Sequence, residues 1–135
     1  AKVEVQGCSV GEIKHGLLVL VAVQPHDTAH SIERMADRLL AYRVFSDSDG
    51  KMNLSVAAVA GGLLLVSQFT LAADTKSGLR PSFTTAAKPE QAKHGFDLLV
   101  TMVKRKHEKV ETGEFGATMQ ISLLNDGPVT FWLET

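Results

Sequence analysis

The sequence predicts a mixed α and β (α/β) fold: a strand-rich mixed sheet, or a distorted β-barrel, with two main helices packed against it. Short apolar runs bounded by Gly and Pro recur along the 135 residues and predict strands, whereas two other segments repeat their apolar residues at helical spacing. A chain of this length buries a core without disulfides or a metal. No repeat or linker divides it, so we expect a single domain over residues 1–135.

Three strands are expected before the first helix, at Ala1–Gln6, Ser9–Ile13 and Leu17–Val23. The helix itself is predicted by an apolar stripe that repeats every three or four residues, with Asp27 or Thr28 as its N-cap. The stripe consists of Ile32, Met35, Ala36, Leu39 and Leu40.

The middle of the chain predicts a hairpin and then a buried strand. Tyr42–Phe45 and Met52–Val56 flank a polar sequence that is typical of a hairpin tip. The apolar run Leu63–Leu71 predicts a strand, and the Ser- and Thr-rich stretch Asp74–Ala87 predicts a loop.

The last part of the chain predicts a second helix and two more strands. Pro89 suits the first turn of this helix. Its apolar stripe consists of Phe96, Leu99, Val100 and Val103. Met119–Leu124 predicts a strand, Asn125–Pro128 a turn, and Val129–Leu133 a closing strand.

The composition favours a globular protein of the cytoplasm. Hydrophobic residues make up 44% and charged residues 21% of the chain, and no apolar run is long enough to span a bilayer. The single cysteine, Cys8, cannot form an internal disulfide, and the strand-like start does not resemble a signal peptide. A net charge of −1 is far from the basic charge typical of proteins that hold nucleic acid through phosphates. We therefore expect a cytoplasmic protein without a membrane partner, whose nucleic-acid contacts, if it has them, are local.

The common metal and catalytic motifs are incomplete. His26 and His30 have the spacing of the zinc-protease helix, but the residue after His26 is not the required Glu and no third ligand follows. Residues 47–50 resemble a calcium loop, yet Phe45 and Val56 occupy positions where that loop has carboxylates. We expect two solvated histidines, a hairpin tip, and no metal or cofactor.

Two polar segments are not accounted for by these motifs. Ser67-Gln68-Phe69-Thr70 ends an apolar strand, at a place where strands open into sites. Its simpler interpretation is a partly exposed strand end. Asn125-Asp126-Gly127-Pro128-Val129-Thr130 is a tight turn made of ordinary turn residues. The Gly-Pro bond can be cis at modest cost, and the sequence does not determine its isomer.

Together these two segments resemble the signature motifs of the D-aminoacyl-tRNA deacylases, also called D-tyrosyl-tRNA deacylases. The family's Ser-Gln-Phe-Thr motif is found at 67–70, and its Asn-x-Gly-Pro-x-Thr motif at 125–130. The similarity covers nearly the whole chain in the right order and includes residues 42–47, 50–54, 80–83 and 113–119. Family members usually begin with a further strand that carries a basic residue. Residues 1–135 do not contain that strand, through truncation of the sequence or through divergence; if the protein itself lacks the strand, we expect weaker support for the Gly-Pro loop.

The resemblance implies hydrolysis of the ester bond of D-aminoacyl-tRNA, and of tRNA mischarged with glycine, releasing the free amino acid and tRNA. It also implies a homodimer with composite sites. The Gly127–Pro128 loop of one subunit would enter the partner's pocket beside Ser67–Thr70, where carbonyl oxygens held parallel by a cis peptide capture the substrate's amino group. A D-residue then points its side chain outward, whereas an L-residue drives its Cβ into the carbonyl wall.

The resemblance also assigns roles to individual residues. The catalytic positions are Ser67, Gln68, Phe69 and Thr70. The substrate-binding positions are Asn125, Gly127, Pro128 and Thr130, together with Phe115 and Met119, which would pack against the 3′-terminal adenine of the aminoacyl-tRNA. Core packing is an equally good interpretation of Phe115 and Met119. Basic residues at Lys88, Lys93 and Lys104–Lys106 are candidates for contact with tRNA phosphates, although a helix end attracts cations in any case.

Thr70 resembles a nucleophile, but no His or carboxylate is evidently placed to activate it. We favour a mechanism in which the protein positions the ester and a water. The 2′-hydroxyl of the terminal adenosine assists, and backbone amides near Phe69 and Thr70 stabilise the oxyanion.

Three alternatives remain at this point. A sister-type deacylase removes a small L-amino acid and holds Gly-Pro in trans, but the Phe of the Ser-Gln-Phe-Thr motif argues against it. A non-catalytic nucleic-acid-binding module is disfavoured because the chain is not basic. A metal-dependent hydrolase is third.

Overall fold

The computed structural model describes residues 1–135 as a mixed α and β structure. The elements in chain order are β1 (Lys2–Val5), β2 (Cys8–Glu12), β3 (Gly16–Val21), α1 (Ala29–Ala41), β4 (Arg43–Ser46), β5 (Met52–Ser55), β6 (Gly62–Ser67), the 3-10 helix η1 (Phe69–Ala72), α2 (Pro89–Lys106), β7 (Val110–Thr112) and β8 (Gln120–Ser122). No helix is both long enough and apolar enough to cross a membrane.

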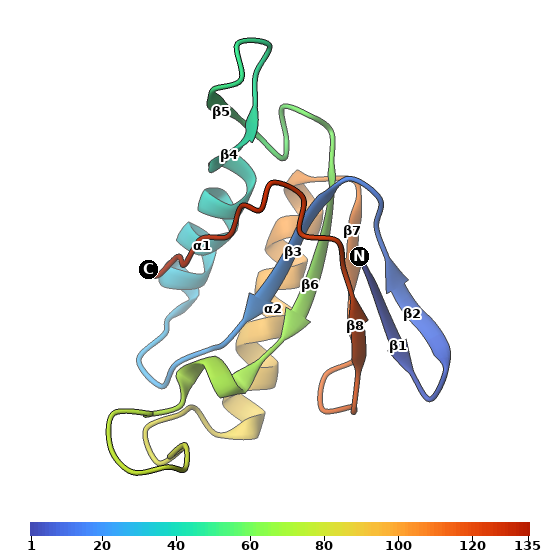
Figure 1. Cartoon of the computed structure of the whole chain (residues 1–135). Coiled ribbons are helices and arrows are strands. Elements are labelled where there is room, and N and C mark those ends of the chain that lie inside the picture. The colour runs from blue at the N-terminus through green and yellow to red at the C-terminus, as the bar shows by residue number, and fades with distance from the viewer.

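Three sheets build the molecule (Figure 1). The central sheet is parallel, in the order β3-β6-β7, and an antiparallel sheet, β2-β1-β8, lies beside it. The hairpin β4-β5 forms the third sheet. In Figure 1, α2 lies behind β3 and β6, and α1 stands to the left of these strands. Because no strand joins the edges of these sheets, they do not close into a barrel. The distorted barrel is therefore wrong, and the open arrangement is the one that forms.

The core is divided by β6, which is buried on both faces. Leu63 and Leu65 point to one side and pack with the apolar stripes of α1 and α2. Leu64 and Val66 point to the other side and pack with Val3 of β1. This alternation is the period of two that a strand imposes on its side chains. It leaves β6 held from both sides up to its last residue.

The helix boundaries follow from capping. Thr28 is the N-cap of α1: its hydroxyl accepts the N–H of Ser31 at 3.1 Å, and the Ser31 hydroxyl accepts the N–H of Thr28 at 2.9 Å. Asp27, the alternative cap, instead accepts the N–H of Gln24 at 2.8 Å. Pro89 occupies the first turn of α2, as predicted.

Two expected strands differ in the structure. The strand predicted over Leu63–Leu71 ends at Ser67, because the chain then tightens into η1, where the N–H of Leu71 donates to the carbonyl of Gln68 at 3.2 Å. The closing strand predicted over Val129–Leu133 does not form. This segment follows α1 instead of a sheet edge, and Arg38 donates to the carbonyl of Glu134 at 2.7 Å.

Candidate functional site

The candidate site lies where the parallel strands end. Ser67, the last residue of β6, pairs with Val21, the last residue of β3, and the N–H of Gln68 donates to the carbonyl of Val21 at 2.7 Å. On the other side of β6, the N–H of Gly113 donates to the carbonyl of Leu65 at 3.0 Å just after β7. The segments that follow β6 and β7 therefore begin at one edge of the sheet. The carboxyl edge of parallel strands is where open α/β sheets bind ligands.

Ser67-Gln68-Phe69-Thr70 carries the chain from the core to the surface. Val66 is fully buried, Ser67 and Gln68 are half-buried, and the side chain of Phe69 is 57% exposed. Gln68 Nε2 donates to Thr70 Oγ1 at 2.6 Å, and no His, Asp or Glu hydrogen-bonds to that hydroxyl. Thr70 therefore has no base to activate it as a nucleophile.

The backbone at this turn has free donors. The N–H groups of Phe69 and Thr70 stand at the start of η1, and they donate to no other atom of the chain. A helical turn leaves its first N–H groups without partners within the turn. Both donors are therefore available to a negatively charged oxygen that binds at this turn.

Phe115 and Met119 lie in the segment between β7 and β8, which runs along the same end of the molecule (Figure 1). The ring of Phe115 lies 6.2 Å from that of Phe96 and packs on the helix side of the core. Met119 packs on the opposite side, and a Cβ at Gly113 would come within 2.7 Å of its Sδ. Both residues are half-buried, so they contact the core and also remain partly open to solvent.

The segment Asn125–Thr130 is braced by its own side chains. Asn125 Nδ2 donates to Thr130 Oγ1 at 3.0 Å, and Asn125 Oδ1 accepts the N–H of Val129 at 3.4 Å. The Gly127–Pro128 peptide bond is cis, the isomer that the resemblance implies. Gly127 has a φ of +132°, and a Cβ there would come within 2.7 Å of Val129 Cγ2.

A single chain does not bring the two motifs together. After β8 the chain crosses in front of the sheet toward α1, whereas η1 lies at the lower end of the molecule (Figure 1). The crossing segment forms no strand and exposes several large apolar side chains. These are Leu123, Leu124, Phe131 and Trp132.

The basic end of α2 is also far from the candidate site. The helix has 18 residues and is therefore about 27 Å long, so Lys104–Lys106 lie a full helix length from the end near η1. Lys106 is paired with Asp37 of α1, and the hydrogen bond to that carboxylate raises the pKa of Lys106. Within one chain these residues therefore lie far from the candidate site, and their contact with other phosphates of a tRNA stays a prediction.

Side chains suited to a metal do not converge in this structure. His26 and His30 are exposed, and no group of three His, Cys, Asp or Glu residues comes together. The carboxylate of Asp47 in the hairpin tip accepts the N–H groups of Asp49 and Lys51, each at 2.9 Å. Its oxygens stabilise the turn itself.

A pocket of about 570 Å³ lies at the opposite edge of the parallel strands. It is lined by the residues that precede β3, β6 and β7, including Lys14, His15 and Lys109. Lys109 Nζ donates to the carbonyl of Ala60 at 3.1 Å, and His107 Nε2 donates to that of Gly61 at 2.6 Å. Because neither Ser67–Thr70 nor Asn125–Thr130 lines this pocket, the carboxyl edge is the stronger candidate.

The structure adds one aromatic residue to the site that the local sequence pattern does not single out. The ring of Phe83, from the loop after η1, lies 5.1 Å from the ring of Phe69. The loop returns to this point because Asp74 and Ser82 exchange two backbone hydrogen bonds, of 2.8 and 2.9 Å. The signals in the sequence are an aromatic residue inside a Ser- and Thr-rich loop and the resemblance of residues 80–83 to the family.

A family model described as D-Tyr-tRNA(Tyr) deacylase matches residues 1–134. The chain belongs to this deacylase family. A D-aminoacyl-tRNA deacylase of Pseudomonas fluorescens is 63% identical over 135 residues, which cover 100% of this chain and 93% of the relative. A D-aminoacyl-tRNA deacylase of Paraburkholderia xenovorans is 59% identical over 140 residues and is covered to 92%.

Two solved structures resemble the deacylase fold of this chain. A c-Myc DNA unwinding element binding protein superimposes with a TM-score of 0.94 at 35% identity, covering 99% of this chain and 91% of the other. A probable eukaryotic D-amino acid tRNA deacylase superimposes with a TM-score of 0.74 at 14% identity, covering 88% and 86%. The second likeness concerns the fold alone.

Proposed function

We propose that this chain hydrolyses the ester bond of D-aminoacyl-tRNA, and of tRNA mischarged with glycine, releasing the amino acid and free tRNA. The observation that carries the proposal is the match of the deacylase family over residues 1–134, with Ser67-Gln68-Phe69-Thr70 at the carboxyl edge of the parallel sheet. Residues 1–135 act as one domain in this proposal.

In the proposed mechanism the protein positions the reacting groups. The N–H groups of Phe69 and Thr70 stabilise the oxyanion that forms when water attacks the ester carbonyl. The 2′-hydroxyl of the terminal adenosine assists the attacking water. The Thr70 hydroxyl, which accepts a hydrogen bond from Gln68, helps to orient the ester and forms no covalent intermediate. Phe115 and Met119, half-buried beside the same edge, contact the terminal adenine.

The complete site in this proposal contains two copies of the chain. Gly127 and Pro128 of one copy enter the pocket beside Ser67–Thr70 of the other. Two observations support it: the motifs lie apart within one chain, and the segment that carries the second motif exposes large apolar side chains. Contiguous exposed apolar surface is typical of interfaces.

Selection between mirror-image substrates follows from this arrangement. The carbonyl oxygens around Gly127 and Pro128 accept hydrogen bonds from the substrate's amino group. The Cβ of an L-amino acid then points at these carbonyl oxygens, whereas the side chain of a D-amino acid points out of the pocket. Glycine has no Cβ and is accepted as well. One pocket therefore admits D-amino acids with many different side chains and excludes L-amino acids.

The proposal is tested by incubating the purified protein with D-tyrosyl-tRNA and L-tyrosyl-tRNA, each with and without a chelator. Release of the amino acid is followed. We expect hydrolysis of the D-ester alone, at a rate that the chelator does not change. A rate that the chelator abolishes would overturn the metal-free mechanism, and cleavage of small L-aminoacyl esters alone would favour the sister-type deacylase.

A second candidate function is nucleic-acid binding without catalysis. It is favoured by the likeness, at 35% identity, to a structure described as a DNA unwinding element binding protein. The same experiment separates the two functions. Binding of tRNA without hydrolysis of either ester would favour the binding module.

A further inference from the structure

The loop that follows η1 is held against the candidate site. Asp74 and Ser82 pair as an antiparallel bridge, and the Asp74 carboxylate accepts the N–H of Lys76 at 2.9 Å. A shallow pocket of about 360 Å³ lies between this turn and the end of η1. The loop, residues 73–88, therefore has a defined base directly after η1.

Two aromatic rings are exposed at this base. Phe69 is 57% and Phe83 38% exposed, although their ring centres lie only 5.1 Å apart and the planes are tilted by 49°. Their mutual contact leaves part of each ring open to solvent. Exposed aromatic faces beside a positively charged groove are the usual platform for unpaired bases.

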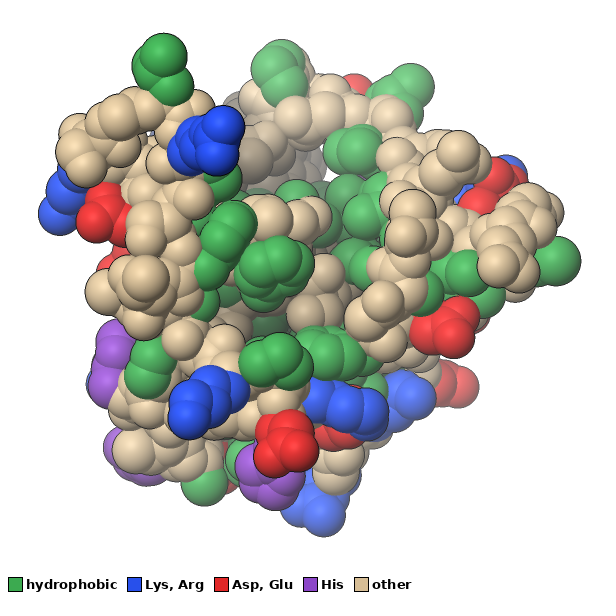
Figure 2. Space-filling model, turned by 90° about the horizontal axis from the view of Figure 1, so that it is seen from below, with side chains coloured by type: hydrophobic (Ala, Val, Ile, Leu, Met, Phe, Trp, Pro, Cys, Tyr) green, Lys and Arg blue, Asp and Glu red, His purple; other side chains and the backbone are tan.

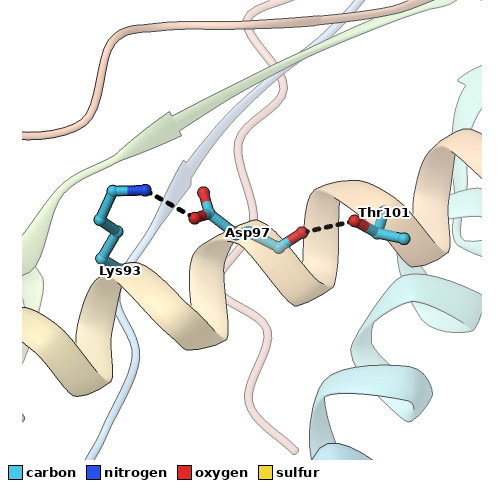
Figure 3. A network of polar contacts seen from close by, with 3 residues as sticks. All are labelled: Lys93, Asp97 and Thr101. Carbon is cyan, nitrogen blue, oxygen red and sulfur yellow. Dashed lines mark hydrogen bonds and ion pairs between the residues drawn. The ribbon is translucent and has the colours of Figure 1, made fainter.

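The cations of the loop are free. Lys76, Arg80 and Lys88 are exposed, and none of them forms an ion pair. The neighbouring Lys93 differs, because its Nζ donates to the Asp97 carboxylate at 2.7 Å on the surface of α2 (Figure 3). Figure 2 looks onto this end of the molecule and shows a hollow with largely apolar walls, with both basic and acidic side chains around it.

We propose that loop 73–88, together with Phe69, is the docking surface for the single-stranded 3′ end of the tRNA. A base that precedes the terminal adenosine stacks on Phe83, and Lys76, Arg80 and Lys88 contact the phosphates of the same strand. The inference rests on the proposed function, since it supplies that site with its polynucleotide. It also gives a chain with a net charge of −1 a local basic surface for RNA, because three cations without ion pairs belong to this one loop.

The first test measures the affinity of an uncharged RNA hairpin ending in a single-stranded CCA, by fluorescence anisotropy at several salt concentrations. The variant Lys76→Ala/Arg80→Ala should bind roughly ten-fold more weakly, with a salt dependence reduced by about 1.4 log units per log unit of salt. The control Lys104→Ala/Arg105→Ala removes the same charge from the last turn of α2 and should bind as tightly as the unmodified protein. An equal or larger loss in the control would overturn the proposal.

The second test addresses the aromatic platform. Phe83→Leu keeps an apolar contact with Phe69 but removes the face on which a base stacks. We expect roughly ten-fold weaker binding of the same RNA with an unchanged melting temperature. Unchanged affinity would contradict the stacking role. Because both tests measure binding of uncharged RNA, their failure is distinguishable from a failure of ester hydrolysis, which the D-tyrosyl-tRNA assay reports separately.

Discussion

The two motifs of this chain are supported in opposite ways. Ser67–Thr70 continues a strand that is buried on both faces, and its first residues are fixed by hydrogen bonds to β3. Asn125–Thr130 belongs to no sheet, and the hydrogen bonds that brace it come from Asn125 and Thr130 themselves. The first motif is positioned by the core of its own chain. The second has a defined local shape and is almost entirely exposed.

This difference explains why a composite site is physically reasonable. A pocket that must orient an ester needs donors fixed to a rigid element, which the end of β6 supplies. A loop that must enter another molecule's pocket needs to project from its own chain. Exposed apolar side chains around that loop favour its burial against a partner.

The largest expected effect comes from removing a buried side chain of β6, the strand that positions the first motif. Leu65→Ala removes a fully buried side chain between β6 and the helices, and should lower the free energy of unfolding by about 2–5 kcal/mol. The matched control Leu124→Ala removes the same atoms from a side chain that is 83% exposed, and should change the stability of the single chain by less than about 0.5 kcal/mol. Denaturant unfolding at low protein concentration measures both, and equal losses would contradict the contrast.

The next effect concerns the second motif alone. Gly127→Ala places a Cβ within 2.7 Å of Val129 Cγ2 at a positive φ, so the loop must change shape. We expect hydrolysis of D-tyrosyl-tRNA to fall about 100-fold, because a misplacement of about 1 Å in a reacting site has this cost. Gly50→Ala is the control, since Gly50 also has a positive φ but its Cβ would meet nothing within 4 Å. A Gly127→Ala protein with normal activity would exclude the loop from the site.

A smaller effect is expected at Thr70. If the site acts by positioning, Thr70→Ala removes one orienting hydroxyl and should reduce the rate less than about ten-fold. Single-turnover hydrolysis of D-tyrosyl-tRNA measures this rate. A variant that folds and binds tRNA normally but shows no hydrolysis would make the Thr70 hydroxyl essential to the reaction and overturn the positioning mechanism.

Local periodicity was enough to predict much of the fold. The apolar run that begins at Leu63 predicted a buried strand, and the apolar stripes predicted both helices. The strand β7 was missed, because Val110–Thr112 has only three residues and follows a charged helix end. The apolar alternation of Val129–Leu133 predicted a strand that does not form, since contacts such as the 5.9 Å approach of Phe131 to Tyr42 draw the segment to α1.

The sequence predicted the separate segments of the candidate site but not how they contact one another. The polar residues after the apolar run predicted that Ser67–Thr70 lies at a strand end, and the structure confirms that position. No local pattern brings Phe83 to Phe69, because this contact depends on the closure of the loop by Asp74 and Ser82. Likewise, the sequence showed charges at Lys104–Lys106 but not their distance from the site.

The smallest expected effect distinguishes two turns, each of which is held by hydrogen bonds from its own side chains. In the hairpin tip, a hydrogen bond from Asn53 and backbone N–H groups lower the pKa of Asp47, whereas the Asn125 loop is braced by a neutral amide. A carboxyl with a lowered pKa stabilises the fold above its unfolded pKa, and this contribution is lost as the pH falls through the folded value. Acidification should therefore loosen the hairpin tip first and leave the Asn125 loop unchanged.

Amide hydrogen exchange at Asp49 and Lys51, compared with Val129, measures this difference as a function of pH after correction for intrinsic rates. Asp47→Asn should abolish the pH dependence and Asp49→Asn should keep it, because the Asp49 carboxylate accepts no hydrogen bond in the turn. Equal acid sensitivity of both turns would show that the Asp47 carboxylate does not hold the tip.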